Sequence, residues 1–386
     1  MISENRWISF FRYANRLAIG DLSSRSDFVS LYREMGDIDI WEFAQRNRVE
    51  PIIAHALMNA LGPDNVPAHW RQAHEESYQR ISAYLAELDR IAARLAEEGV
   101  TTIVIENGAL AKAIYPCPGC FVFGDLDLLV RREEIPIVHH VLTDIGYTAL
   151  FGDSLPQCLP DLSNGRAEYG RMLDGNYTMR LNIQWSLVAR RWFEATREPA
   201  VADLLEQSIP IEGSAARMLC PEDNLFQLAI HNASHAYVCK PGIRLHLDID
   251  RFVTHATVNW RDFVSLVERF RVRTPVYFSL AIPKILFNTP IPDGVLHRLR
   301  PPAWKEYLIT RWLQQLGFFN PDEKKFSRIG YIIFTALLYD DLSGLWRGIF
   351  PDQKWMRERY GIKSEKRLPL FYLKRLMDLT FRRINT

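Results

Sequence analysis

The segment Phe123 to Val130, with the sequence FGDLDLLV, constrains the fold of this chain more than any other segment. Two carboxylates stand one residue apart in an apolar, strand-forming run that follows Gly124. Side chains at positions i and i+2 of a strand project from the same face, so Asp125 and Asp127 should share one face of a sheet. Leu126 and the leucine after Asp127 should then face a hydrophobic core.

This carboxylate pair has a chemical consequence. Two unpaired carboxylates held so close together repel each other, and one of them would normally take up a proton. A divalent cation removes that conflict, because Mg²⁺ takes oxygen ligands and is commonly held by one or two carboxylates plus substrate phosphates. The pattern therefore indicates metal-dependent phosphoryl or nucleotidyl transfer.

The 386-residue chain is too long for one typical domain. A long run rich in Ala, Leu, Glu and Arg predicts a helix from Ala68 to Glu98, ended by Gly99. Strand and turn signals follow, and helical patterns return at Pro221. The predicted regions are a helical N-terminal region (1–98), an α/β core (99–215), a helical C-terminal domain (216–320) and an extension with a basic tail (321–386). This organisation predicts an α+β fold with a small mixed sheet between helical regions.

The central region shows its own order of elements. β-Branched runs, helical patterns and turn residues predict strands at 101–105 and about 121–130, helices at 108–115 and 135–146, and strands at 167–173 and 177–187. The last two strands flank Asp174-Gly175-Asn176, a strong hairpin signal. A strand, helix, strand, helix order describes a small α/β unit whose sheet the hairpin extends.

Composition narrows the class of protein. Hydrophobic residues make up 48% and charged residues 24% of the chain, as in ordinary soluble proteins. The net charge of +1 gives no general attraction for long nucleic acids. An odd number of scattered cysteines favours a reducing compartment. Arg12 and Arg16 interrupt the N-terminal apolar residues, and the apolar run 330–339 is too short to cross a bilayer, so we expect a soluble cytoplasmic protein.

Several motifs together indicate a family. The run Ile105-Glu106-Asn107-Gly108-Ala109-Leu110-Ala111, then Tyr115-Pro116, then Gly124-Asp125-Leu126-Asp127-Leu128-Leu129-Val130, resembles the uncharacterised nucleotidyltransferase family of the DNA polymerase β-like superfamily. The resemblance continues through residues 145–147, 181–185, 221–223 and 231–235. It covers roughly Ser30 to Val253, so the last third of the chain lies largely outside it.

The resemblance implies roles for particular residues. In that superfamily a glycine at a helix start lets the backbone approach nucleotide phosphates, and two strand aspartates bind metal ions. It places Asp125 and Asp127 as the catalytic and metal-binding pair, and Gly108, Asn107 and Gly124 beside the nucleotide. An anion site at a helix N-terminus agrees with this placement. The implied activity is Mg²⁺-dependent transfer of a nucleoside monophosphate from an NTP, with ATP the expected donor, to an unidentified small-molecule or protein acceptor.

The chain departs from the family pattern at four positions. Asn182 and Gln184 stand where an acidic residue and a histidine are usual, Asn107 replaces a lysine, and Phe121 replaces an arginine. Asn182 can still offer a neutral oxygen ligand at the nucleotide and metal site. The alternative prediction is therefore a catalytically weakened or inactive protein of the same fold that binds nucleotide or a partner.

Two histidines indicate which residues should contact the acceptor substrate. His231 and His235 are four residues apart and share one face of a predicted helix, with Arg244 nearby, so we expect these three residues to contact substrate. A third interpretation makes the histidines the centre of a zinc hydrolase completed by Asp248 and Asp250. Histidines packed between helices are the commoner outcome, and the sequence lacks a His-Glu-x-x-His motif.

Two other motifs receive structural interpretations. Cys117-Pro-Gly-Cys120 resembles a redox motif or half of a zinc site, but no second cysteine pair with metal-ligand spacing accompanies it. Its proline and glycine predict a simple turn. The basic tail from Lys374 to Arg383 is typical of a solvated helix face, with an anionic surface as the alternative.

Overall fold

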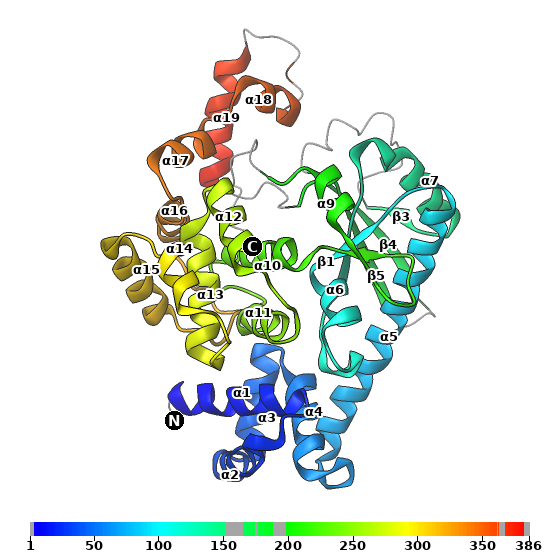
Figure 1. Cartoon of the computed structure of the whole chain (residues 1–386), viewed down its shortest axis with the longest axis vertical. Helices are drawn as coiled ribbons and strands as arrows, with labels where there is room; N and C mark the ends of the chain where they lie inside the picture. The colour runs from blue at the N-terminus through cyan, green and yellow to red at the C-terminus, as the bar shows by residue number, and fades with distance from the viewer. Residues whose placement is uncertain are drawn as a thin grey trace.

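The computed structural model describes residues 4–150, 165–173, 177–187, 198–360, 362 and 367–381. Within these residues seven strands form one mixed sheet in the order β3-β4-β5-β2-β1-β7-β6. Helices within residues 4–61 lie at one end of the molecule, and helices within residues 221–299 lie beside the sheet (Figure 1). The predicted α+β fold with flanking helical regions is confirmed.

The sheet brings the acidic strand to its centre. The strands are β1 (Ile103–Ile105), β2 (Asp125–Leu129), β3 (Thr148–Ala149), β4 (Arg166–Leu173), β5 (Tyr177–Gln184), β6 (Ile209–Pro210) and β7 (Arg217–Met218). Strand β2 runs antiparallel to β1 and parallel to β5, so Asp127 is paired with Ile105 on one side and Asn182 on the other. Strands β4 and β5 pair antiparallel as predicted, although the turn signal at residues 174–176 lies outside the described residues.

Some of the N-terminal helices end at residues with positive φ. The N-terminal helices are α1 (Glu4–Ala18), α2 (Arg25–Met35), α3 (Asp37–Asn47), α4 (Glu50–Leu61) and α5 (Ala68–Glu97). Gly36, with φ 86°, ends α2, and Arg48, with φ 57°, ends α3 in the left-handed region. Helix α5 ends one residue before the predicted position and reaches from the other N-terminal helices up to the sheet (Figure 1).

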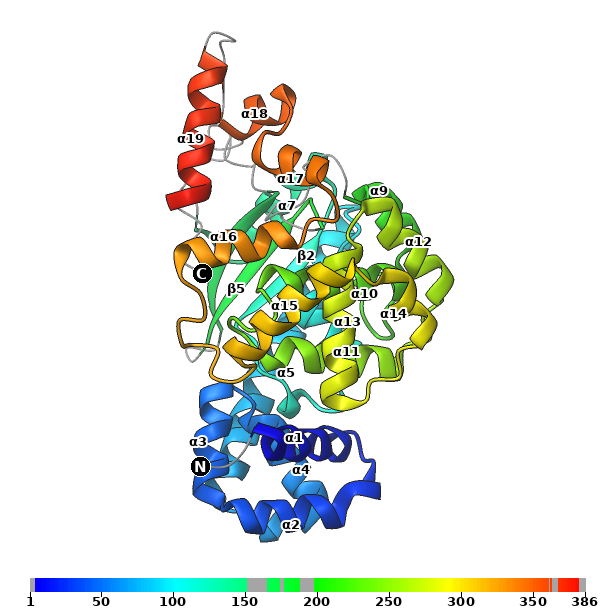
Figure 2. The same ribbon diagram turned by 90° about the vertical axis from the view of Figure 1, so that its left-hand side faces the viewer.

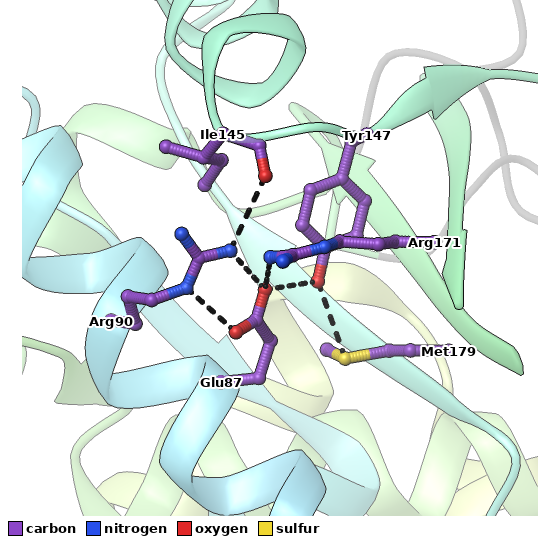
Figure 3. Close-up of polar contacts among 6 residues, drawn as sticks. All are labelled: Glu87, Arg90, Ile145, Tyr147, Arg171 and Met179. Atoms are coloured by element: carbon purple, nitrogen blue, oxygen red, sulfur yellow. Dashed lines mark hydrogen bonds and ion pairs between the residues drawn. The ribbon is translucent and has the colours of Figure 1, made fainter. Parts of the chain in front are cut away.

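A buried ionic cluster fixes α5 to the sheet (Figure 3). Glu87 of α5 accepts hydrogen bonds from Arg90 at 2.5 Å, Arg171 of β4 at 2.8 Å and the Tyr147 hydroxyl at 3.0 Å. Arg171 is paired with Met179 of β5, an odd-numbered position that points away from the face occupied by Asn182. Helix α5 therefore covers the face of the sheet opposite the acidic residues.

Three helices complete the core, and ten helices of the described residues form the C-terminal half. The core helices are α6 (Glu106–Ala113), α7 (Ile135–Asp144) and α9 (Val201–Gln207), and the later ones are α10 (Pro221–Ser234), α11 (Ile243–His255), α12 (Trp260–Phe270), α13 (Arg273–Phe287), α14 (Asp293–Leu299), α15 (Ala303–Leu316), α16 (Arg328–Leu337), α17 (Leu342–Ile349), α18 (Gln353–Tyr360) and α19 (Leu368–Phe381). One hydrophobic cluster extends from Phe10 to Leu338, and a small separate cluster contains Met356 and Leu368. The helices α18 and α19 project from one end of the molecule (Figure 2). The three predicted boundaries between the four regions stay predictions.

The length and composition of a helix decide whether it could cross a membrane. Among the described helices, none combines the length and the apolar character that crossing a bilayer requires.

Candidate active site

Asp125 and Asp127 lie on the same face of β2, as the alternation of side chains predicts. The Nδ2 group of Asn182 donates hydrogen bonds to both carboxylates, at 3.2 Å to Asp125 and 3.0 Å to Asp127. The Nε2 group of Gln184 donates a third hydrogen bond, at 2.6 Å, to Asp127. Leu126 and Leu128 are fully buried on the other face. The recorded hydrogen bonds of this acidic pair come from neutral amides of β5.

Burial makes Asp127 unusual. Its exposed fraction is 4%. Loss of hydration raises its pKa well above the usual value, and the negative charges of Glu106 and Asp125 raise it further. The amides of Asn182 and Gln184 lower the pKa but do not cancel these effects. An added cation would therefore stabilise the ionised form of Asp127.

Glu106 is a third carboxylate of the site, and no motif in the sequence pointed to it. It is the first residue of α6, directly after β1, and its φ of 53° lies in a region that residues other than glycine rarely adopt. Its carboxylate lies 2.8 Å from Nδ1 of His231 and accepts a hydrogen bond from Gln227 at 2.7 Å. Only the antiparallel pairing of β1 with β2 brings this residue beside Asp127.

Gly108 is required by the close packing of α6 against the sheet. A Cβ atom at this position would lie 2.6 Å from the Val104 side chain and 2.8 Å from the Leu126 side chain. Its φ is not in the left-handed region, so a turn conformation does not require the glycine. The close approach of α6 to the sheet does. A role of Gly108 beside phosphates stays a prediction.

Arg244 joins the site from α11. Its Nη2 donates a hydrogen bond to Oδ1 of Asn107 at 3.0 Å, and its guanidinium lies over the Phe121 ring, 5.5 Å from the ring centroid. Its Nε is buried without a hydrogen-bond partner in the structure. Arg244 therefore brings a positive charge beside Asn107, the position at which the family pattern has a lysine.

The two histidines that we expected to contact substrate lie on the Glu106 side of the site. The His231 and His235 rings stack with centroids 4.9 Å apart. Nearby, the Tyr115 hydroxyl donates to Asp248 at 2.9 Å, and burial raises the Asp248 pKa while Arg244 lowers it. The structure therefore brings His231 and Arg244 into contact with Glu106 and Asn107, whereas His235 reaches the site through His231.

The zinc-hydrolase interpretation finds no support in this arrangement. Asp250 instead accepts hydrogen bonds from Asn15 and from Thr289. Within the part of the chain that the structure describes, no group of three or more metal-ligating side chains includes His231 or His235.

Two further residues border the acidic pair. Gly124 is exposed, and a Cβ built on it would have no atom within 4 Å, so it lies at an open edge of the site. Glu168 of β4 is paired with Asn182 and forms an ion pair with Arg166 at 3.0 Å. The alternation of side chains along β4 was the signal that could have identified Glu168.

The donor set fits one magnesium ion. Asp125 and Asp127 offer carboxylate oxygens on one face, and rotation of the Asn182 amide would present a neutral oxygen beside them. The like charges that raise the Asp127 pKa make a bound cation favourable. These residues would hold the ion.

The comparison with known proteins agrees with the sequence motifs. The model of a family described as an uncharacterised nucleotidyltransferase matches residues 33–288, more than half of the chain. The matched segment runs from α2 to the end of α13 and includes both aspartates, α6 and Arg244. No curated protein matches the chain. On this match, the chain belongs to the uncharacterised nucleotidyltransferase family.

Proposed function

We propose that this protein transfers a nucleoside monophosphate from an NTP, with ATP as the expected donor, to an unidentified acceptor in a Mg²⁺-dependent reaction. One observation carries the proposal. Asp125 and Asp127 are held together by Asn182, and the pKa of the buried Asp127 is raised by neighbouring negative charge. A site of this kind gains stability from a cation, and a cation can link it to a triphosphate.

The metal side would use Asp125 and Asp127, with Asn182 as a neutral third ligand. When bound, Mg²⁺ neutralises charge on the transferred phosphoryl group and orients it. Glu106 would keep the site strongly negative without an added acid on β5, because its charge already acts on Asp127. Glu106 would thus supply the negative charge that an acidic residue at position 182 supplies in related sequences.

The phosphate side would use the first turn of α6. No side chain caps the N-terminus of this helix, and backbone N–H groups in the first turn of a helix can bind an anion. Gly108 and Asn107 stand in that turn, and the exposed Gly124 directly precedes Asp125. Arg244, held by Asn107, would contribute the positive charge that phosphates need.

The acceptor side would be formed by α10 and α11. His231 is oriented by Glu106, and a histidine so placed can take a proton from an attacking hydroxyl. His235 stacks on His231 and extends the same wall. The near-neutral chain suits a small molecule or a protein better than a long nucleic acid. Among the described residues, Cys117, Cys120, Cys220 and Cys239 form no disulfide, which accords with a reducing, cytoplasmic compartment.

Pyrophosphate release from ATP and Mg²⁺ tests the proposal. We expect Asp125→Asn and Asp127→Asn each to lower the rate by about 100-fold or more, because each removes a charged ligand. Asp144→Asn is the matched control, since Asp144 is an exposed residue at the end of α7 and has no assigned part in the site. Undiminished turnover in both site variants would disprove the assignment.

A second candidate function is nucleotide binding without chemistry. The amides of Asn182 and Gln184, in the place of an acid and a base, favour it. Isothermal titration calorimetry with ATP and Mg²⁺ separates the two. Binding that depends on Asp125 and Asp127, without pyrophosphate release by the wild-type protein, would support the binding protein over the enzyme.

A further inference from the structure

Four side chains outside the candidate active site converge on one point. Within the described residues, one group of metal-ligating side chains has ligand atoms that all lie within 4.8 Å of one another. We call it the Cys2His2 cluster: His55 of α4, His74 of α5, and Cys117 and Cys120 of the turn between α6 and β2. Two cysteines and two histidines are a ligand set typical of structural zinc.

The distances within the cluster suit a tetrahedral ion. Nδ1 of His55 lies 3.2 Å from Nε2 of His74, and Sγ of Cys117 lies 3.6 Å from the same Nε2. Ordinary zinc bond lengths in a tetrahedron put two nitrogens about 3.4 Å apart and a nitrogen and a sulfur about 3.6 Å apart. Both measured separations are therefore close to those of coordinated ligands.

The turn around the cysteines is built for this approach. The backbone N–H of Gly119 donates to Sγ of Cys117 at 3.3 Å, which would stabilise a thiolate. A Cβ atom on Gly119 would overlap the imidazole ring of His74. Glycine at this position is thus needed for His74 to reach the sulfur.

We propose that His55, His74, Cys117 and Cys120 bind one zinc ion. All four positions of the tetrahedron would come from the protein, so the site is structural and closed. The ion would join α4 and α5 to the turn that leads into the acidic strand β2. Phe121, which follows Cys120, lies under Arg244 and accepts a hydrogen bond from Ser77 of α5. Zinc would therefore steady one wall of the candidate active site, whatever reaction occurs there.

Metal analysis of the purified full-length protein tests this proposal directly. We expect about one zinc per chain in the wild type and in Cys220→Ser and Cys239→Ser, whose cysteines lie outside the cluster. We expect Cys117→Ser and His74→Gln to lose the zinc, and Gly119→Ala to bind it more weakly. Chelation by EDTA should lower the Tm of the wild type toward that of Cys117→Ser.

Cobalt provides a readout that does not depend on the variants folding. Co²⁺ added to chelated wild-type protein should give the intense visible bands of a tetrahedral site and thiolate charge-transfer absorption in the near ultraviolet. Zinc content no higher in the wild type than in Cys117→Ser, or a cobalt spectrum without thiolate absorption, would overturn the proposal. A Cys117–Cys120 disulfide in protein purified without air would overturn it as well.

Discussion

Asp127 shows how a single buried carboxylate can be both costly and useful. Its side chain is nearly inaccessible to water, and its neighbours on the site side are two more acids and two amides. Such a group is stable when it is protonated or when a cation lies beside it. On a solvent-exposed strand end, water would hydrate the same acidic side chains, and their charges would cost little stability.

Asp127→Asn should change how stability depends on pH. A raised folded-state pKa means that the native protein holds a proton which the unfolded chain releases above about pH 3.8. The free energy of unfolding of the metal-free wild type should therefore fall as pH rises from 3.8 through the folded-state pKa. We expect the variant to be more stable than the wild type by at least about 1 kcal/mol near pH 8, with the difference shrinking toward pH 4.

Urea denaturation at several pH values, with and without Mg²⁺, measures this effect. Saturating Mg²⁺ should restore the wild type at high pH and leave Asp127→Asn unchanged. A constant difference between the two proteins across the pH range would show that Asp127 does not titrate in this way. Asp144→Asn, at an exposed position, should follow the wild type throughout.

At the scale of elements, the site depends on how closely α6 lies against the sheet. Gly108 makes that approach possible, because Val104 and Leu126 occupy the space where a Cβ would stand. The helix then begins directly after β1, with Glu106 in a strained backbone conformation. On the same face of the sheet, opposite the acidic pair, Glu87 of α5 accepts hydrogen bonds from Arg171 of β4 and from Tyr147 (Figure 3).

Gly108→Ala should push α6 away from the sheet. Overpacking of a close helix–sheet contact costs about 1–3 kcal/mol, so we expect a loss of that size in the free energy of unfolding. Gly124→Ala is the control, because a Cβ there would meet no atom within 4 Å. Urea denaturation of both variants makes the comparison, and equal stabilities would contradict the packing role of Gly108.

At the scale of the whole molecule, Asp250 joins the first helix to the C-terminal half. This buried carboxylate accepts hydrogen bonds from Asn15 of α1 and, at 2.6 Å, from Thr289 after α13. Arg251 donates to the backbone carbonyl of Asn15 as well. Because one hydrophobic cluster spans these elements, loss of these hydrogen bonds should lower the stability of the whole protein.

Asp250→Ala should lower the free energy of unfolding by about 2–4 kcal/mol, since it leaves buried donors without acceptors. We expect the main unfolding transition of the variant to stay single, as one continuous core predicts. Asp64→Ala, at an exposed position between α4 and α5, should change stability by no more than about 0.5 kcal/mol. A separate early transition in Asp250→Ala would instead show that α1 unfolds independently.

Local patterns in the sequence determined much of this architecture. The helical period and its glycine stop predicted α5, and the hairpin signal predicted β4 and β5. The alternation of side chains predicted the shared face of Asp125 and Asp127. These features depend on residues a few positions apart, whose geometry the backbone fixes. The two-residue strands β6 and β7 were missed because they are too short to show any period.

Only the tertiary structure decided which distant residues meet. It placed Glu106 beside Asp127, Arg244 beside Asn107, and two histidines of the N-terminal helices beside Cys117 and Cys120. It also decided that Asp127 is buried and that Gly108 is a packing residue. These facts depend on strand pairing and on helices packing across long stretches of chain, and no spacing along the sequence encodes such contacts.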